Sequence, residues 1–348
     1  MELTALPGNI IFSANLKEDL HGVLAETRYS HMVVLVDLNT RKACYPKLQS
    51  LLPQHSVIEI EAGEINKNLE TCAHVWRELT GFKVDRKGLL IVLGGGVPGD
   101  LGGFCAATYK RGIDFILLPT TLLSQVDASV GGKLGIDFAQ YKNHIGVFKE
   151  PVATIIHTPF LQTLPMHELR SGFAEVIKHC LLSDKAMWNT IRKKKLEEQD
   201  WQTLVEHSVS FKASVVNDDP HESGLRKILN FGHTIGHALE SYFLSSSKRL
   251  MHGEAIGIGM IAESWLAHKK GLLKATELEQ IQHYIIQIFG KVTLPDNKED
   301  VASLALQDKK NVANKILIAV PKGIGRYIWD VEVTKEELVE ALNYYGSV

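Results

Sequence analysis

The sequence lacks the features that mark membrane, secreted or nucleic-acid-binding proteins. Its 348 residues carry a formal net charge of -2, so bulk charge gives no attraction to a polyanion. No apolar run is long enough to span a bilayer, and the N-terminal segment shows neither the basic start nor the apolar core of a signal peptide. We therefore expect a cytoplasmic protein with no nucleic-acid partner and no membrane contact.

Cysteine is also scarce, and the cysteines are scattered along the chain. Their spacing fits neither a structural zinc site nor a disulfide framework, which favours a reducing compartment. Three of them lie in apolar or helical contexts, where we expect buried free thiols. The cysteines are Cys44, Cys72, Cys105 and Cys180.

The first half of the chain alternates short β-rich runs with helical patterns. The runs are continuously apolar and end at turn residues, as in strands that are buried on both faces of a parallel sheet. Helical stretches at residues 66–79 and 100–110 lie between them, which predicts a doubly wound α/β domain over residues 1–163. The expected strands are residues 33–36, 57–60, 89–93, 115–118 and 153–156.

The pattern changes after the last of these strands. Residues 167–307 show helical period almost throughout, which predicts an all-α domain over residues 164–348. Near its end, apolar runs at residues 315–320 and 326–329 flank a turn rich in Pro and Gly and predict a β-hairpin, and residues 338–344 predict a last helix. The predicted fold is therefore α/β plus all-α, and we expect a site in the cleft between the two domains.

A glycine-rich turn at residues 94–100 follows a predicted strand and opens a predicted helix. Glycine lets the backbone approach a pyrophosphate, and the N-terminus of a helix offers N–H donors and a partial positive charge. The string is not a strict GxGxxG, so a tight turn without a ligand is the alternative. Asp37 ends an earlier strand, where it either accepts from a ribose hydroxyl or caps a helix, and spacing alone does not decide.

Three short segments supply one carboxylate, Glu175, and three imidazoles, His233, His237 and His252. His233 and His237 are four residues apart and share one face of a predicted helix, but their string lacks the Glu of HExxH and does not indicate a peptidase. The chain has 15 histidines, so chance pairs are expected, and any one alone is more simply a surface or core histidine. Two imidazoles and a carboxylate would bind Zn²⁺ and leave a position for substrate oxygens.

Basic residues lie beside these motifs. Each alone is most simply a solvated surface charge. Their placement beside glycine-rich turns and metal candidates predicts a doubly anionic substrate. They are Lys133, Lys142, Lys178, Lys212 and Arg226.

Several strings taken together resemble the 3-dehydroquinate synthases, which are sugar-phosphate cyclases of the shikimate pathway. They are GGGVPGDLGGF at residues 94–104, ATYKRG at residues 107–112, PTTLLSQVDASVGGK at residues 119–133, KNHIG at residues 142–146, and the three metal segments. The resemblance runs nearly end to end. It implies a Rossmann-like N-terminal domain, an α-helical C-terminal domain and a homodimer.

The resemblance also implies roles for the residues that match. It places Zn²⁺ or Co²⁺ at Glu175, His233 and His252. It places NAD⁺ against Asp37, Glu64, Lys67, Gly95, Gly96, Val97, Asp100, Thr120, Thr121, Lys133, Lys142 and Thr163. It places a phosphorylated sugar acid against Asp127, Lys133, Asn143, Lys178, Lys212, Arg226, Asn230 and His237. Arg111 corresponds to a residue that reaches the partner subunit's site, and Lys309 or Lys310, of which we favour Lys309, corresponds to a phosphate contact.

The implied reaction converts 3-deoxy-D-arabino-heptulosonate 7-phosphate into 3-dehydroquinate and phosphate. Transient oxidation by NAD⁺ would acidify a neighbouring C–H, so that phosphate leaves, and return of the hydride and an aldol closure would complete a redox-neutral cycle. One alternative is a sibling cyclase that acts on sedoheptulose 7-phosphate or glucose 6-phosphate, which lack the carboxylate that would explain Lys133, Lys212 and Arg226 together. Another is a metal- and NAD-dependent polyol dehydrogenase, which would turn over free NAD⁺.

Overall fold

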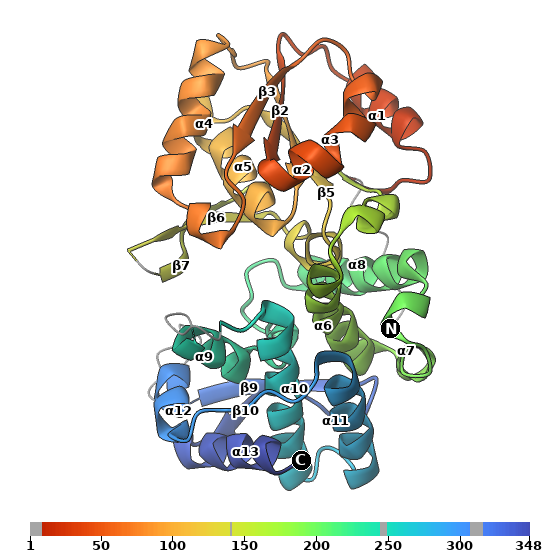
Figure 1. The fold of residues 1–348 in the computed structure, drawn as a ribbon, viewed down its shortest axis with the longest axis vertical. Helices are drawn as coiled ribbons and strands as arrows, with labels where there is room; N and C mark the ends of the chain where they lie inside the picture. Colours follow the sequence, from red (N-terminus) through yellow and green to blue (C-terminus); the bar gives the residue numbers. More distant parts are fainter. Residues whose placement is uncertain (1–8, 140, 244–248, 307–315) are drawn as a thin grey trace. The chain divides into compact units, whose positions relative to one another are not determined.

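The computed structural model describes residues 9–139, 141–243, 249–306 and 316–348 (Figure 1). The chain divides into two compact units. Unit 1 comprises Met1–Leu169 and Val205–Ala213, and unit 2 comprises Arg170–Leu204 and Ser214–Val348. A search of the described helices finds none that is long and apolar enough to cross a membrane.

Unit 1 is built on a six-stranded sheet in which all neighbouring strands run parallel (Figure 1). The five predicted strands are present, and a short first strand is added at one edge. In spatial order the strands are β1 (Ile10–Phe12), β8 (Ala153–Ile156), β5 (Asp114–Pro119), β4 (Leu89–Gly94), β2 (Met32–Asp37) and β3 (Ser56–Ile60).

Helices cover both faces of this sheet, because alternate side chains of each strand point to opposite sides. Leu35 and Val92 belong to one buried cluster, which α4 (Leu69–Gly81) and α5 (Gly96–Thr108) complete. Val34 and Ile91 belong to the other, with residues of α1 (Leu16–Ala25) and α3 (Tyr45–Leu48) beside them. Helix α2 (Leu38–Ala43) follows β2 directly. The doubly wound α/β prediction is therefore confirmed.

Helix α5 begins earlier than the sequence predicted. The glycine-rich string was expected to form a turn before a helix at residue 100, but Gly96 is already the first residue of the helix. Pro98 is tolerated because the first N–H groups of a helix have no partner within it. The glycine turn and the N-terminus of α5 are therefore one structure.

Unit 1 also contains a hairpin that was not predicted, formed by β6 (Lys133–Phe138) and β7 (Tyr141–Phe148). Residues 141–144 of β7 are exposed, and only Ile145 and Val147 pack against the core, so the alternation of polar and apolar residues is too short to mark a strand. Short 3-10 or π turns complete the unit. They are η1 (Gln49–Leu51), η2 (Glu64–Asn66), η3 (Tyr109–Arg111), η4 (Ser124–Ala128) and η5 (Thr158–Thr163).

Unit 2 is mainly helical, as predicted, and it carries the predicted antiparallel hairpin of β9 (Ile316–Pro321) and β10 (Tyr327–Val333). Its buried helix is α10 (His252–Lys269), which packs against α9 (His233–Phe243), α11 (Ala275–Phe289) and α13 (Lys335–Ser347). The other helices are α6 (Met166–Ser183), α7 (Lys185–Ile191), η6 (Leu196–Glu198), α8 (Trp201–Asp218), η7 (Leu225–Asn230) and α12 (Lys298–Leu306). Of these, α6 begins in unit 1 and the middle of α8 belongs to unit 1.

Candidate functional site

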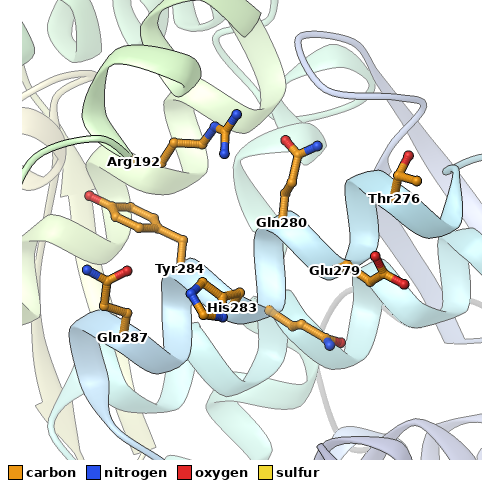
Figure 2. A pocket seen from close by; sticks show the side chains of 8 residues that line it. Arg192, Thr276, Glu279, Gln280, His283, Tyr284 and Gln287 are labelled. Carbon is orange, nitrogen blue, oxygen red and sulfur yellow. The ribbon is translucent and has the colours of Figure 1, made fainter.

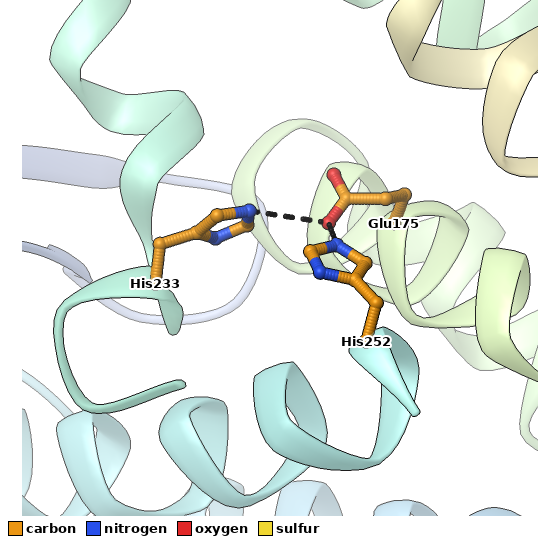
Figure 3. Close-up of side chains that lie close together, drawn as sticks. All are labelled: Glu175, His233 and His252. Atoms are coloured by element: carbon orange, nitrogen blue, oxygen red, sulfur yellow. Dashed lines mark ion pairs between the residues drawn. The ribbon is translucent and has the colours of Figure 1, made fainter. Parts of the chain in front are cut away.

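Three predicted metal ligands meet within unit 2 (Figure 3). Glu175 lies on α6, while His233 and His252 are the first residues of α9 and α10. The Nε2 atoms of His233 and His252 lie 3.5 Å and 3.6 Å from Glu175 Oε1. These separations are too long for charge-assisted hydrogen bonds. They match the spacing of about 3.3 Å between two ligand atoms that sit 2.0–2.1 Å from one tetrahedral ion.

The other ring nitrogen of each imidazole has its own acceptor. His233 Nδ1 lies 3.1 Å from the carbonyl oxygen of Phe231, and His252 Nδ1 lies 3.4 Å from Glu240 Oε1. An acceptor at Nδ1 keeps a proton on that nitrogen and leaves Nε2, which faces Glu175, as the atom available to a metal ion. Such partners orient the histidines of metal sites in proteins.

Glu175 is completely buried, and its charge is balanced by cations. Lys178, one turn along α6, forms an ion pair with Glu175 Oε2. Burial acts to raise the pKa of Glu175, but Lys178 and His252 outweigh it and hold the pKa well below its ordinary value. Glu175 Oε1 faces the Nε2 atoms of His233 and His252, while Oε2 faces Lys178. An ionised, buried carboxylate beside two imidazole Nε2 atoms fits a divalent cation such as Zn²⁺ or Co²⁺.

Burial also acts to lower the pKa of His252, but contacts with Glu175 and Glu240 outweigh it and raise the pKa to about 9. Without an ion, His252 is therefore protonated at neutral pH. A metal ion at Nε2 would replace that proton.

His237 lies beside this cluster rather than within it. Its ring packs edge-on against that of His233, with centroids 5.1 Å apart, and its Nε2 lies 4.0 Å from Glu240 Oε2. Its side chain is 46% exposed, against 12% for His233. The geometry therefore separates one solvent-facing imidazole from the two that face Glu175.

The two predicted cations of unit 2 that lie in its described part, Lys178 and Arg226, are buried. Lys178 Nζ donates to the carbonyl oxygen of Leu229 at 2.6 Å. Arg226, in η7, is only 3% exposed, and its Nη1 donates to the carbonyl oxygen of Pro220 at 2.8 Å. Both side chains are fixed by backbone carbonyls near η7.

Asp219, which was not predicted as a site residue, holds the loop that leads to Arg226. Its Oδ1 accepts from Ser223 N at 3.0 Å, and its Oδ2 accepts from the N–H groups of Gly224 and Arg226 at 2.7 Å and 3.0 Å. Burial acts to raise the pKa of Asp219, but these donors outweigh it and hold the pKa well below its ordinary value. The signal in the sequence was an Asp followed closely by Ser-Gly, a typical side-chain-capped loop. In the same loop, Asn230 Nδ2 donates to Glu222 Oε1 at 2.8 Å.

A second group of predicted residues meets in unit 1. Lys67 is 4% exposed, and its Nζ lies 2.5 Å from both Asp100 Oδ2 and Asn143 Oδ1. The backbone also joins these segments, because Asp137 N donates to the carbonyl oxygen of Lys67 and Asn143 N donates to Asp137 Oδ1. The β6–β7 hairpin is thereby tied to the first turns of α5.

Lys212, on the part of α8 that belongs to unit 1, pairs with Asp127. Its Nζ lies 2.7 Å from Asp127 Oδ1 and 2.6 Å from the carbonyl oxygen of Asp127. The structure therefore brings a predicted acid and a predicted cation of the substrate set into contact.

The glycine turn leaves no space for a side chain at Gly95. A Cβ on Gly95 would lie 2.8 Å from Thr121 Cγ2, and Thr120 N donates to the carbonyl oxygen of Gly94 at 3.0 Å. Gly95 and Gly96 therefore present bare backbone at the N-terminus of α5. Val97 lies in the first turn of α5, and Glu64, in η2, is close enough for its charge to act on Lys67 and Asp100.

Asp37 takes one of the two roles that the sequence left open. It caps α2, where its Oδ1 accepts from Thr40 N at 2.7 Å. A contact with a ribose stays a prediction. Thr163 Oγ1 donates to the carbonyl oxygen of Phe160. Cys44 Sγ lies 3.4 Å from Thr163 Oγ1. All four cysteines are buried and free, as expected for three of them.

Other predicted residues lie apart from these groups. Lys133 and Lys142 are exposed on the hairpin. Arg111 is exposed and follows the C-terminal end of α5, whose 13 residues span about 20 Å. It cannot join the glycine turn at the other end of that helix. Lys309 and Lys310 lie outside the described residues.

A shallow polar pocket lies elsewhere on unit 2 (Figure 2). It carries none of the predicted site residues, so it is not the candidate site. Its lining is Arg192, Thr276, Glu279, Gln280, Gln282, His283, Tyr284 and Gln287.

Comparison with known proteins identifies the family. The model of the 3-dehydroquinate synthase N-terminal region matches residues 57–171, and that of the C-terminal region matches residues 172–311. The 3-dehydroquinate synthase of Parabacteroides distasonis is 36% identical over 342 residues, which cover 97% of each chain. The chain belongs to the 3-dehydroquinate synthase family. The 3-dehydroquinate synthase of Nitratiruptor sp. is 41% identical to it over 298 residues, which cover 84% of each chain.

Solved structures share the fold of this 3-dehydroquinate synthase family member. A 2-epi-5-epi-valiolone synthase from Streptomyces hygroscopicus, with NAD⁺ and Zn²⁺ bound, has a TM-score of 0.86 at 24% identity and covers 100% of this chain and 99% of its own. A 2-deoxy-scyllo-inosose synthase, complexed with carbaglucose-6-phosphate, NAD⁺ and Co²⁺, has a TM-score of 0.84 at 20% identity, with 96% of each chain covered. An NADH-dependent butanol dehydrogenase from Thermotoga maritima scores 0.68 at 16% identity, covering 98% of this chain and 97% of its own.

Proposed function

We propose that the chain catalyses the 3-dehydroquinate synthase reaction, a carbon–oxygen lyase step that releases phosphate from 3-deoxy-D-arabino-heptulosonate 7-phosphate and closes a carbocycle. The observation that carries the proposal is the convergence of Glu175, His233 and His252 in a chain of this family. The relatives at 36% and 41% identity bear this activity in their names.

We assign Zn²⁺ or Co²⁺ to Glu175, His233 and His252, and NAD⁺ to unit 1. When bound, the metal would polarise substrate hydroxyls, and the nicotinamide would accept a hydride and return it. Of the synthases that share the fold, the 2-epi-5-epi-valiolone synthase carries NAD⁺ and Zn²⁺, and the 2-deoxy-scyllo-inosose synthase carries NAD⁺ and Co²⁺. The spacing of the Nε2 and Oε1 atoms and the complete burial of Glu175 support the metal assignment.

The chain's own residues would bind the anionic substrate and manage its protons. Arg226 offers two parallel N–H donors that match a carboxylate and stays charged when buried. Lys178 keeps Glu175 ionised without occupying the Nε2 atoms. His237 is half exposed and carries an imidazole that exchanges protons with solvent, so we assign it the role of proton carrier at Nε2.

In unit 1, the N-terminus of α5 would hold the pyrophosphate of NAD⁺ through the backbone of Gly95 and Gly96. Lys67 is already neutralised by Asp100, so it would bind the cofactor as part of a pair. We propose residues 1–163 as the nucleotide-binding domain and residues 164–348 as the metal- and substrate-binding domain.

We also propose a homodimer in which Arg111 serves the site of the partner. The support is the position of Arg111 past the far end of α5, which keeps it from the glycine turn of its own chain.

The test is to incubate the purified protein with the heptulosonate phosphate, Zn²⁺ and a small amount of NAD⁺, and to follow phosphate and NADH together. We expect many phosphates released per NAD⁺ and no accumulation of NADH. Stoichiometric NADH from a polyol would instead identify a dehydrogenase. Turnover of sedoheptulose 7-phosphate or glucose 6-phosphate, without turnover of the heptulosonate, would identify a sibling cyclase.

A further inference from the structure

Helices α9 and α10 both begin with an imidazole of the metal cluster, and they touch through backbone near the start of α9. A Cβ on Gly259 of α10 would lie 1.9 Å from the carbonyl oxygen of Gly232 and 3.0 Å from Gly236 N. No side chain separates the two helices there. The position of the first turn of α9 is therefore set by α10.

Gly232, which precedes the first residue of α9, cannot provide the usual side-chain cap. Its φ is +81°, and a Cβ there would lie 2.6 Å from Met260 Cγ. The first N–H groups of a helix need acceptors, and Ser, Thr, Asp or Asn normally provides one from this position. Helix α9 needs an acceptor from elsewhere.

Glu263 supplies it from α10, one turn beyond Gly259 and on the same face. Glu263 is 0% exposed. Its Oε2 accepts from Gly232 N at 2.6 Å, and its Oε1 accepts from Ile235 N at 3.1 Å. These two N–H groups flank His233 in the sequence. A carboxylate at this place also complements the partial positive charge of the helix N-terminus.

The two helices brace each other's imidazole. Glu263 of α10 holds the backbone that carries His233, and Glu240 of α9 contacts Nδ1 of His252. The contact of Glu240 with His252 Nδ1 is of a kind known to tune metal sites. Glu263 does not touch an imidazole, and it acts on His233 through the backbone at the start of α9.

We propose that Glu263 is a positioning residue of the metal site, which fixes His233 by capping α9 from the neighbouring helix. The proposal rests on the metal assignment made above. Ligands must be held within a few tenths of an ångström for tight binding, so loosening the first turn of α9 weakens the site even though Glu263 touches no ligand atom.

The test compares Glu263→Gln with Glu277→Gln. Gln keeps the shape of Glu263 but turns one acceptor into a donor that faces a backbone N–H. The control Glu277, on α11 of the same unit, accepts from Ile324 N at 3.4 Å and pairs with Lys185, away from the metal cluster. Zn²⁺ affinity would be measured by competition with a chelator, and ligand geometry by the visible absorption of bound Co²⁺.

We expect Glu263→Gln to raise the Kd for Zn²⁺ by about 10- to 100-fold and to change the Co²⁺ spectrum, as for other outer partners of metal ligands. Glu277→Gln should leave both as in the wild type. Glu263→Gln with unchanged Kd and spectrum would reduce Glu263 to a stability role and overturn the proposal. If the wild-type chain binds no Zn²⁺, the metal assignment itself fails. This outcome is distinguishable from failure of the Glu263 proposal, because it is seen in the wild type alone.

A second measurement needs no variant and so decides the matter even if Glu263→Gln does not fold. The cap exists before any ion binds, so the amides of Gly232 and Ile235 should exchange slowly with deuterium in the metal-free wild type. Exchange of these two amides as fast as in an open loop would mean that Glu263 does not hold the start of α9, and would overturn the proposal.

Discussion

Replacing Glu175 with Gln should destabilise the chain even without metal, because the buried Lys178 would lose its charged partner. Lys178 is 1% exposed, and Glu175 is its charged partner on α6. Removing one member of a buried pair costs about 3–5 kcal/mol. We expect the low end, about 3 kcal/mol, because Lys178 keeps its hydrogen bond to the carbonyl oxygen of Leu229.

The assay is calorimetry in a chelator. For a unit of this size, about 3 kcal/mol lowers the Tm by about 6–12 °C. Adding Lys178→Met to Glu175→Gln removes the stranded cation and should restore part of the loss. As a control, Glu340→Gln breaks an exposed pair with Lys269 and should change stability by less than about 1 kcal/mol. A Glu175→Gln variant that melts like the wild type, or a double variant no more stable than the single one, would refute the reasoning.

Three further predictions concern the loop, the dimer and the substrate. The folded pKa of Asp219 lies below its unfolded value of about 3.9, so its stabilising contribution is present above that pH and lost as the pH falls through the folded pKa. Asp219→Asn should lower the urea midpoint at neutral pH and flatten its fall in acid; an unchanged acid limb would contradict this. Mixing inactive Arg111→Ala and Glu175→Gln chains should restore activity if Arg111 serves the partner, and no restoration would place it in its own site. Arg226→Lys should lose about 30- to 1000-fold in kcat/KM, nearly as much as Arg226→Met, because Lys lacks the planar fork. A substrate analogue without the carboxylate should lose far less, and equal losses would assign Arg226 to the phosphate or to the fold.

The strands and the metal cluster were accessible from the sequence because their signals are local. Each strand is a continuous apolar run, and β4 is buried at every position. Each metal ligand stands in a short string of residues whose types already indicate chemistry. The sheet then followed from the alternation of strands and helices, and only β1, with three residues, was too short to give a signal.

The parts that were missed depend on contacts between segments. Glu263 sits in a helix whose neighbouring residues are apolar or small, so its role emerges only when α9 is packed against it. Asp219 acts on backbone N–H groups, and the Ser-Gly that follows it indicates a loop but not which N–H groups the carboxylate holds. The β6–β7 hairpin buries only a few residues, chiefly Leu134 and Ile136, and contacts of Lys67 with Asp137 and Asn143 tie it to the rest of unit 1, so periodicity could not find it.

The His-Gly-Glu string at the start of α10 shows how a short motif can encode a site by three different means. His252 supplies the imidazole. Gly253 permits close contact with α6, since a Cβ there would lie 2.3 Å from the carbonyl oxygen of Ser171, one turn before Glu175. Glu254 Oε2 accepts from Met251 N at 2.9 Å and so fixes where α10 begins.

The start of a helix is decisive when the ligand is its first residue. A shift of one residue turns a side chain by about 100° around the helix axis, which would carry an imidazole out of reach of Glu175. Glu254 fixes this start for α10 from within the helix, and Glu263 fixes it for α9 from the neighbouring one. Neither carboxylate faces the proposed ion, yet both decide whether His233 and His252 meet on the same oxygen of Glu175.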